Sequence, residues 1–137
     1  MTDLRKLLIK HEGLRLKPYV DTVGKLTIGI GRNLDDNGIS EDEANLMFAN
    51  DLRRIIVEAT EAFTWFKFLS RTRQDVVLNM IFNMGIKRFG GFIKFIDALS
   101  SGAFDKAADE MLNSRWSGQV GIRADELSNM MRVDRYV

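Results

Sequence analysis

Cysteine is absent from the 137-residue chain, and histidine occurs once, at position 11. The absence of cysteine excludes a disulfide framework, a thiolate nucleophile and a thiolate metal site. A single histidine also argues against a histidine-rich zinc site, and no serine near His11 suggests a Ser-His-Asp triad. Carboxylates are therefore the main candidates for acid–base chemistry, and we expect neither a metal nor an organic cofactor.

Neither sign of charge dominates, because the chain has 20 Lys and Arg residues and 19 Asp and Glu residues. A protein that neutralises nucleic-acid phosphates usually carries a clear basic excess or a basic stripe. The near balance therefore favours a soluble enzyme or binding module over a nucleic-acid binder. Residues 1–10 are interrupted by charges every few positions, unlike a signal peptide or a membrane span. We expect no export signal and no membrane insertion.

The first 38 residues change their pattern twice. Residues 3–12 have the leucine spacing of a short amphipathic helix, and Gly13 is placed to form its left-handed C-terminal cap. Short alternating runs from Leu14 to Ile30, with a turn near Gly24, predict an antiparallel hairpin. Residues 32–38 have the composition of a loop.

The rest of the chain is helical in pattern. Ser40 and Glu43 form a capping box at the start of a long helix that continues to Phe63. An apolar helix is predicted over residues 72–84, and shorter helices over 92–99, 103–112 and 124–131. We therefore predict an α+β, predominantly helical fold, with a small N-terminal lobe that contains the hairpin (about 13–50). A long helix joins it to a helical C-terminal lobe (about 64–137), with a cleft between the lobes and residues 1–12 packing on either one.

Three residues before position 35 combine side chains suited to hydrolysis. Glu12 ends the first helix, where unpaired carbonyls favour the protonated carboxyl that a general acid needs. Asp21 ends the first expected strand and Thr27 lies in the second, so a hairpin can bring them close. Two carboxyls roughly 6.5–9.5 Å apart, with a water between them, are the parts of an inverting glycosidase. On this pattern alone, a second interpretation stays open. In it, Glu12 is a solvated residue at the helix end and Asp21 is a turn former.

The strings around these residues resemble the active-site region of the lysozymes of T-even bacteriophages and related endolysins. The matching strings are HEGLRLK at positions 11–17, Tyr19, Asp21-Thr22, Gly24 and TIGIG at positions 27–31. In that family a glutamate, eight residues, an aspartate or cysteine, five residues and a threonine follow one another, as they do here. Further resemblance in NMIFNMG at 79–85, GF at 91–92 and SRW at 114–116, with Gln119, Arg123 and Ala124, covers the C-terminal lobe. The resemblance implies one phage-type lysozyme domain over residues 1–137.

By resemblance, the chain hydrolyses the β-1,4 bond between N-acetylmuramic acid and N-acetylglucosamine in peptidoglycan. Glu12 would be the general acid, Asp21 the base or electrostatic partner, and Thr27 the residue that holds the attacking water. Arg123 would lie near the catalytic glutamate, and we expect Asn33, Phe82, Asn83 and Arg123 to contact the glycan strand. The resemblance also implies a monomer that lyses the host at the end of a phage cycle. It would wait in the host cytoplasm until a holin gives it access to the wall.

Three positions depart from the family's pattern. Arg32 replaces a common histidine, the loop from 32 to 39 is much shorter, and Ile122 replaces a polar neighbour of the arginine. Two other interpretations therefore stay open. One is a peptidoglycan-binding module without catalysis, and the other is a lysozyme module of a phage tail or a bacterial toxin.

Two features of the second lobe have structural interpretations. Asn79 and Asn83 share one face of an apolar helix, so we expect buried amides that need a backbone or substrate partner. Trp116 and the aromatic segment around Trp65 are expected to pack in the core, with sugar stacking as the alternative.

Overall fold

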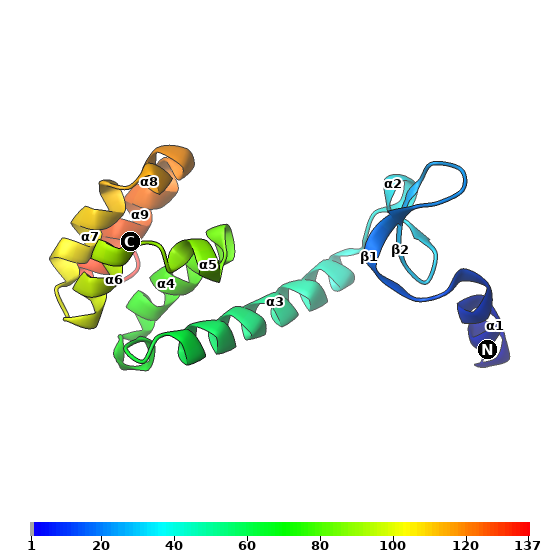
Figure 1. Cartoon of the computed structure of the whole chain (residues 1–137), viewed down its shortest axis with the longest axis horizontal. Helices are drawn as coiled ribbons and strands as arrows, with labels where there is room; N and C mark the ends of the chain where they lie inside the picture. The colour runs from blue at the N-terminus through cyan, green and yellow to red at the C-terminus, as the bar shows by residue number, and fades with distance from the viewer. Residues whose placement is uncertain (1) are drawn as a thin grey trace. The chain divides into compact units, whose positions relative to one another are not determined.

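A computed structural model describes residues 2–137 of the chain (Figure 1). The chain divides into two compact units, Met1–Met47 and Phe48–Val137. Helix α1 (Thr2–Glu12) opens the first unit and has no buried residue. It ends as expected, because Gly13 adopts a φ of 76° and its N–H donates to the carbonyl of Ile9 at 2.7 Å.

A three-stranded antiparallel sheet follows, in the order β1 (Arg15–Val20), β2 (Leu26–Gly29) and β3 (Arg32–Asn33). The β1–β2 hairpin confirms the expectation for residues 14–30, with Tyr19 opposite Thr27. The register shifts between Arg15 and Tyr19, in the part of the edge strand that contains Pro18. Proline lacks a backbone N–H, so an irregular edge strand is where a sheet accepts it.

The expectation of a loop over residues 32–38 was wrong, because β3 and a single helical turn, α2 (Leu34–Asn37), occupy it. Asn33 caps this turn by accepting a hydrogen bond from the N–H of Asp36 at 3.0 Å. Asp35 accepts one from the N–H of Leu26 in β2 at 2.7 Å. These polar residues read as a loop in the sequence, but their side chains complete a short helix and attach it to the sheet.

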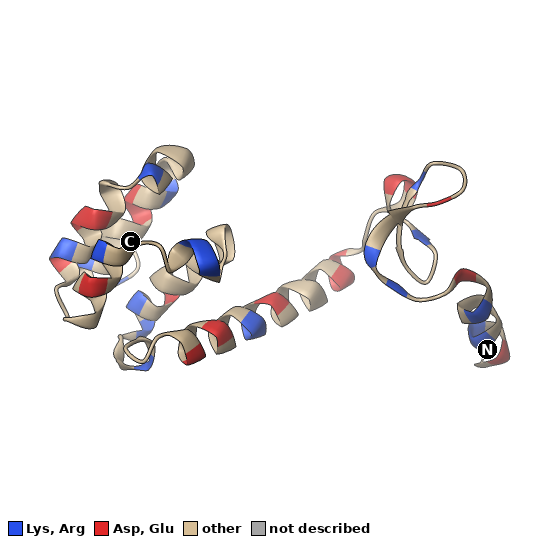
Figure 2. Ribbon diagram, viewed as in Figure 1, with Lys and Arg blue, Asp and Glu red and all other residues tan. Residues whose placement is uncertain are grey.

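Helix α3 (Glu41–Ala62) begins with the predicted capping box. The Ser40 hydroxyl accepts from the N–H of Glu43 at 3.1 Å, and the Glu43 carboxylate accepts from the N–H of Ser40 at 2.9 Å. Arg32 of β3 adds two further hydrogen bonds to the same carboxylate, at 2.9 and 2.6 Å. The Arg32 guanidinium, together with Ser40, lowers the pKa of Glu43 to about 2. Figure 2 shows acidic residues at the start of α3, where the helix dipole favours negative charge.

The second unit continues from α3 through a series of short helices. After the 3-10 helix η1 (Phe66–Phe68) come α4 (Arg71–Met84), α5 (Ile86–Phe89), α6 (Ile93–Ser100), α7 (Phe104–Leu112), α8 (Arg115–Val120) and α9 (Ile122–Val133). Helices α5 and α8 were not expected. Glycines at 85, 90 and 118 weaken the helical pattern around them, but α8 forms because Ser114 caps it through the N–H of Ser117. The α+β, predominantly helical fold class is confirmed.

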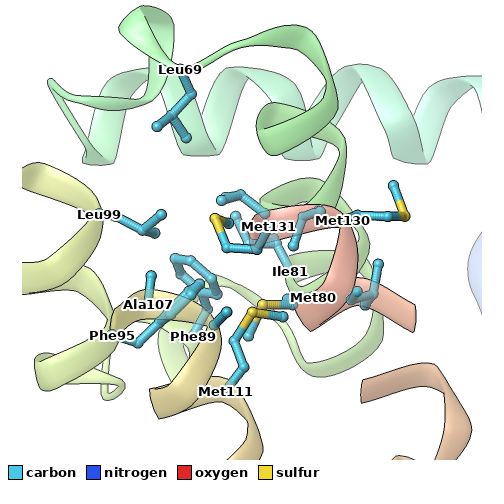
Figure 3. Packing of buried hydrophobic residues seen from close by; sticks show 14 of the residues in the cluster. Leu69, Met80, Ile81, Phe89, Phe95, Leu99, Ala107, Met111, Met130 and Met131 are labelled. Carbon is cyan, nitrogen blue, oxygen red and sulfur yellow. The ribbon is translucent and has the colours of Figure 1, made fainter. Parts of the chain in front are cut away.

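The hydrophobic core lies in the second unit, between the C-terminal half of α3 and the helices α4 to α9 (Figure 3). Phe89 and Phe95 pack edge to face with centroids 5.9 Å apart, and Met80 and Met111 are fully buried beside other apolar side chains. Trp116 is 1% exposed, which confirms its predicted role in packing. Within the described part of the chain, no helix has both the length and the apolar character needed to cross a membrane.

The lobe boundaries, the cleft and the packing of residues 1–12 stay predictions.

Candidate active site

Glu12 lies at the C-terminal end of α1, and its side chain is close to the turn between β2 and β3. A Cβ atom built on Gly31 of that turn would lie 2.5 Å from Oε2 of Glu12 and 2.8 Å from its Cδ. These distances are shorter than van der Waals contact, so the carboxyl of Glu12 occupies the space that a side chain at position 31 would need. The end of the first helix and the central hairpin thus meet at the carboxyl predicted to be the general acid.

Asp21 and Thr27 are both fixed by the backbone of Lys25. Oδ1 of Asp21 accepts hydrogen bonds from the N–H of Val23 at 3.0 Å and from the N–H of Lys25 at 2.8 Å. The N–H of Asp21 donates to the Lys25 carbonyl at 2.9 Å, and the Thr27 hydroxyl donates to the same carbonyl at 2.9 Å. The hairpin therefore holds the carboxylate and the hydroxyl through the backbone N–H and carbonyl of one residue, Lys25. Among residues 2–137, no side-chain or backbone donor is bonded to Oδ2 of Asp21.

Thr27 is 3% exposed and is one of two buried polar residues in the described chain. It lies in the central strand, opposite Tyr19 of β1 and opposite Asn33 of β3. Directly opposed residues of antiparallel strands point to the same face of a sheet, so these three side chains share a face. The guanidinium of Arg15 lies over the Tyr19 ring at 4.4 Å.

Asn33, a predicted substrate contact, is already engaged within its own unit. Its Oδ1 accepts from the N–H of Asp36, and its Nδ2 donates to the Asp36 carboxylate at 2.8 Å. These bonds give Asn33 a structural role as the cap of α2. Its contact with substrate stays a prediction.

A groove of about 410 Å³ in the second unit contains two of the predicted substrate residues, Phe82 and Arg123. Phe82 is 45% exposed, and its ring packs edge to face on Phe48 with centroids 5.8 Å apart. The Arg123 guanidinium donates from Nε to Oδ1 of Asn79 at 2.9 Å, which fixes its position at the groove. The other lining residues are Phe48, Leu52, Asp75, Leu78, Asn79 and Tyr136.

The expectation that Asn79 and Asn83 are buried amides was wrong, because both residues are exposed. Each lies on the face of α4 toward α8 and α9 and accepts a hydrogen bond from one of these helices. Oδ1 of Asn83 accepts from Nε1 of the buried Trp116 at 2.9 Å, while Asn79 accepts from Arg123. Asn83 therefore satisfies the one polar group of a core residue, and its contact with substrate stays a prediction.

The sequence predicted no site role for Gly31, the backbone of Lys25 or Tyr136, although Gly31 ends the TIGIG string. Gly31 and the backbone of Lys25 act through contacts that depend on the folded hairpin. Tyr136 lines the groove from the C-terminal segment, where a hydrogen bond to the Asp75 carboxylate at 2.6 Å and partial burial raise its pKa. Among residues 2–137, no three His, Asp or Glu side chains lie together as metal ligands would.

Comparison with known proteins agrees with the motif resemblance. The family model for phage lysozyme matches residues 9–132. The chain is 29% identical to the pre-baseplate central spike protein Gp5 of Enterobacteria phage T4 over 91% of its own length, and it spans 27% of that protein.

Two relatives come from Dictyostelium discoideum. The probable T4-type lysozyme 1 is 26% identical, with 96% of this chain and 94% of that protein covered. The probable T4-type lysozyme 2 is also 26% identical, with 93% and 92% covered. The resemblance inferred from the sequence strings is thereby confirmed, and the chain belongs to the phage lysozyme family, with the glycoside hydrolase activity of a lysozyme.

Proposed function

We propose that this lysozyme cleaves the β-1,4 bond between N-acetylmuramic acid and N-acetylglucosamine, with Glu12, Asp21 and Thr27 at the reacting centre. The family assignment supports hydrolysis of peptidoglycan. The assignment of roles is supported by the motif spacing and by the local geometry of the first unit. No metal or organic cofactor takes part in the proposed reaction.

The observation that carries the proposal is the shared anchor at Lys25. The Lys25 carbonyl accepts a hydrogen bond from the Thr27 hydroxyl. The lone pairs of Thr27 Oγ1 are therefore left to accept a hydrogen bond from water. The Lys25 N–H fixes Oδ1 of Asp21 and leaves Oδ2 without a donor among the described residues. A water held between these two side chains donates one hydrogen bond to Thr27 Oγ1 and one to Asp21 Oδ2. A lone pair of the water oxygen is then free to attack.

In the proposed reaction, the water oxygen bonds to the anomeric carbon of N-acetylmuramic acid while the bond to the glycosidic oxygen breaks. Asp21 takes one proton from the water, and Glu12 gives its proton to the leaving oxygen of N-acetylglucosamine. Attack from the side opposite the leaving group inverts the anomeric configuration. The proton from Asp21 returns to Glu12 through solvent before the next turnover.

We also propose that the groove of the second unit binds the glycan strand. Phe82 presents an exposed ring on which a sugar face can pack, and Arg123 and Tyr136 provide polar groups beside it. The Arg123 guanidinium keeps further donors after its bond to Asn79, and these suit the carbonyl and carboxylate oxygens of peptidoglycan.

Digestion of purified peptidoglycan tests the reaction. The fragments are reduced with borohydride and analysed by mass spectrometry, and we expect N-acetylmuramic acid at every new reducing end. New ends that carry N-acetylglucosamine would contradict the cleavage site. Binding to the walls without new reducing ends would instead support the binding-module alternative. Proton NMR of fresh products tests the stereochemistry, since inversion gives the α-anomer first.

We propose that the protein acts as a monomer in host lysis, and that it reaches the wall from the host cytoplasm through a holin lesion. Expression in a host with a periplasmic reporter tests this route. We expect reporter release only when a holin is expressed, and release without a holin would contradict it. Similarity to the central spike protein of phage T4 favours a tail-associated role as the second candidate. Recovery of the protein in purified phage particles would support that role.

A further inference from the structure

Two glycines with nearly the same backbone conformation lie at the connection from β2 to β3: Gly29 ends β2, and Gly31 lies in the turn that follows. Gly29 has a φ of 70° and Gly31 a φ of 69°. They differ in what surrounds them. A Cβ on Gly29 would meet no atom within 4 Å, whereas a Cβ on Gly31 would lie 2.5 Å from Oε2, 2.8 Å from Cδ and 3.0 Å from Cγ of Glu12.

We propose that Gly31 is a positioning residue for the general acid, because its bare backbone leaves the space in which the Glu12 carboxyl lies. This inference rests on the proposed role of Glu12. The three short distances run along the whole end of the Glu12 side chain, so a methyl group at position 31 overlaps the carboxyl and the carbon that carries it. A side chain at position 31 therefore moves the acid away from the turn.

The displacement should affect catalysis more than folding. Glu12 is exposed, and its side chain is flexible at the end that meets Gly31, so it can rotate into solvent without disturbing the sheet. A general acid works only within hydrogen-bonding reach of the glycosidic oxygen. A displacement of about 1 Å at a reacting group is enough to cost on the order of 100-fold in rate.

Gly29 gives a matched control for the backbone. A residue other than glycine is strained at both positions, because both have positive φ. Only the change at position 31 also displaces Glu12. Comparison of Gly31→Ala with Gly29→Ala therefore separates the contact with the acid from the conformational cost. The pair Gly31→Asn and Gly29→Asn repeats the test with a residue that accepts positive φ more readily than alanine.

The experiment measures kcat and KM on soluble glycan fragments and the pH dependence of kcat, with circular dichroism to confirm folding. We expect kcat of Gly31→Ala to fall by about 10- to 100-fold with little change in KM, while Gly29→Ala stays near wild type. The alkaline limb of the pH profile, which reports loss of the acid's proton, should move only in the Gly31 variants.

Equal kcat values for the two alanine variants would overturn the proposal, as would a rise in KM with unchanged kcat. The ¹³C resonance of the Glu12 carboxyl gives a readout besides activity. We expect it to shift in the Gly31 variants and to stay in place in the Gly29 variants. If wild type fails to cleave peptidoglycan, the proposed function fails. The carboxyl resonance still decides whether Gly31 positions Glu12, since an unchanged resonance contradicts the contact.

Discussion

The hydrogen bond between Trp116 and Asn83 allows a quantitative test of how the second unit is held together. Trp116 is 1% exposed, and its indole N–H is satisfied by Oδ1 of Asn83 at 2.9 Å. Replacing Asn83 by leucine removes this acceptor and leaves the N–H buried in an apolar setting. An unsatisfied buried donor costs roughly 1–3 kcal/mol, which lowers Tm by about 3–10 °C in a protein of this size.

The assay is urea or thermal unfolding followed by circular dichroism, with Asn129→Leu as the control. Asn129 is an exposed asparagine in α9, and its side chain has no hydrogen-bond partner among residues 2–137. A double-mutant cycle with Trp116→Phe isolates the bond. Because phenylalanine has no N–H to leave unpaired, Asn83→Leu should cost about 1–2 kcal/mol less in the Trp116→Phe background. Equal stability of Asn83→Leu and Asn129→Leu would refute the reasoning.

Three further effects on stability follow from the ion pairs and hydrogen bonds. The pKa of Glu43 is lowered to about 2 by Arg32, so its contribution is complete above the ordinary value near 4.5 and is lost as the pH falls from there toward 2. In the Glu43→Gln variant, Tm should depend less on pH between these two values. The hydrogen bond to Asp75 raises the pKa of Tyr136 above 10, so its contribution is lost as the pH rises above 10, and Tyr136→Phe should remove this alkaline loss in a Tm profile. Arg73 donates to two backbone carbonyls at the C-terminal end of α9, at 2.8 and 3.3 Å, and Arg73→Met should cost roughly 2–3 kcal/mol in urea unfolding.

Local signals in the sequence predicted the elements that depend on neighbouring residues. Gly13 ends α1, and the capping box of Ser40 and Glu43 begins α3, because both motifs act within one helical turn. The hairpin was predicted for the same reason, since its alternating pattern and its turn are close together in the chain.

The elements that were missed depend on contacts between separate segments. Helix α2 is a single turn, and Asp35 attaches it to Leu26 of β2, which lies nine positions earlier in the chain. The hydrogen-bond partners of Asn79 and Asn83 lie in α9 and α8, more than 30 positions away in the chain. Periodicity places such residues on a helix face but does not tell which neighbour covers that face.

The candidate site shows the same division. The spacing of Glu12, Asp21 and Thr27 was visible in the strings that resemble the phage lysozymes. The space that Gly31 leaves for Glu12 was not visible, because 18 residues and a strand turn lie between the two positions. The role of the Lys25 carbonyl, which accepts hydrogen bonds from Asp21 and Thr27, could not be predicted either, since any residue type supplies that backbone group.

The most direct test of the account compares wild type with Glu12→Gln in the clearing of Gram-negative cells whose outer membrane has been permeabilised. Glutamine keeps the shape of the side chain but has no acidic proton to give to the leaving oxygen. We predict that wild type clears the suspension and that the folded Glu12→Gln variant is slower by about 10²- to 10⁴-fold. Clearing by Glu12→Gln at the rate of wild type would contradict the claim that Glu12 is the general acid.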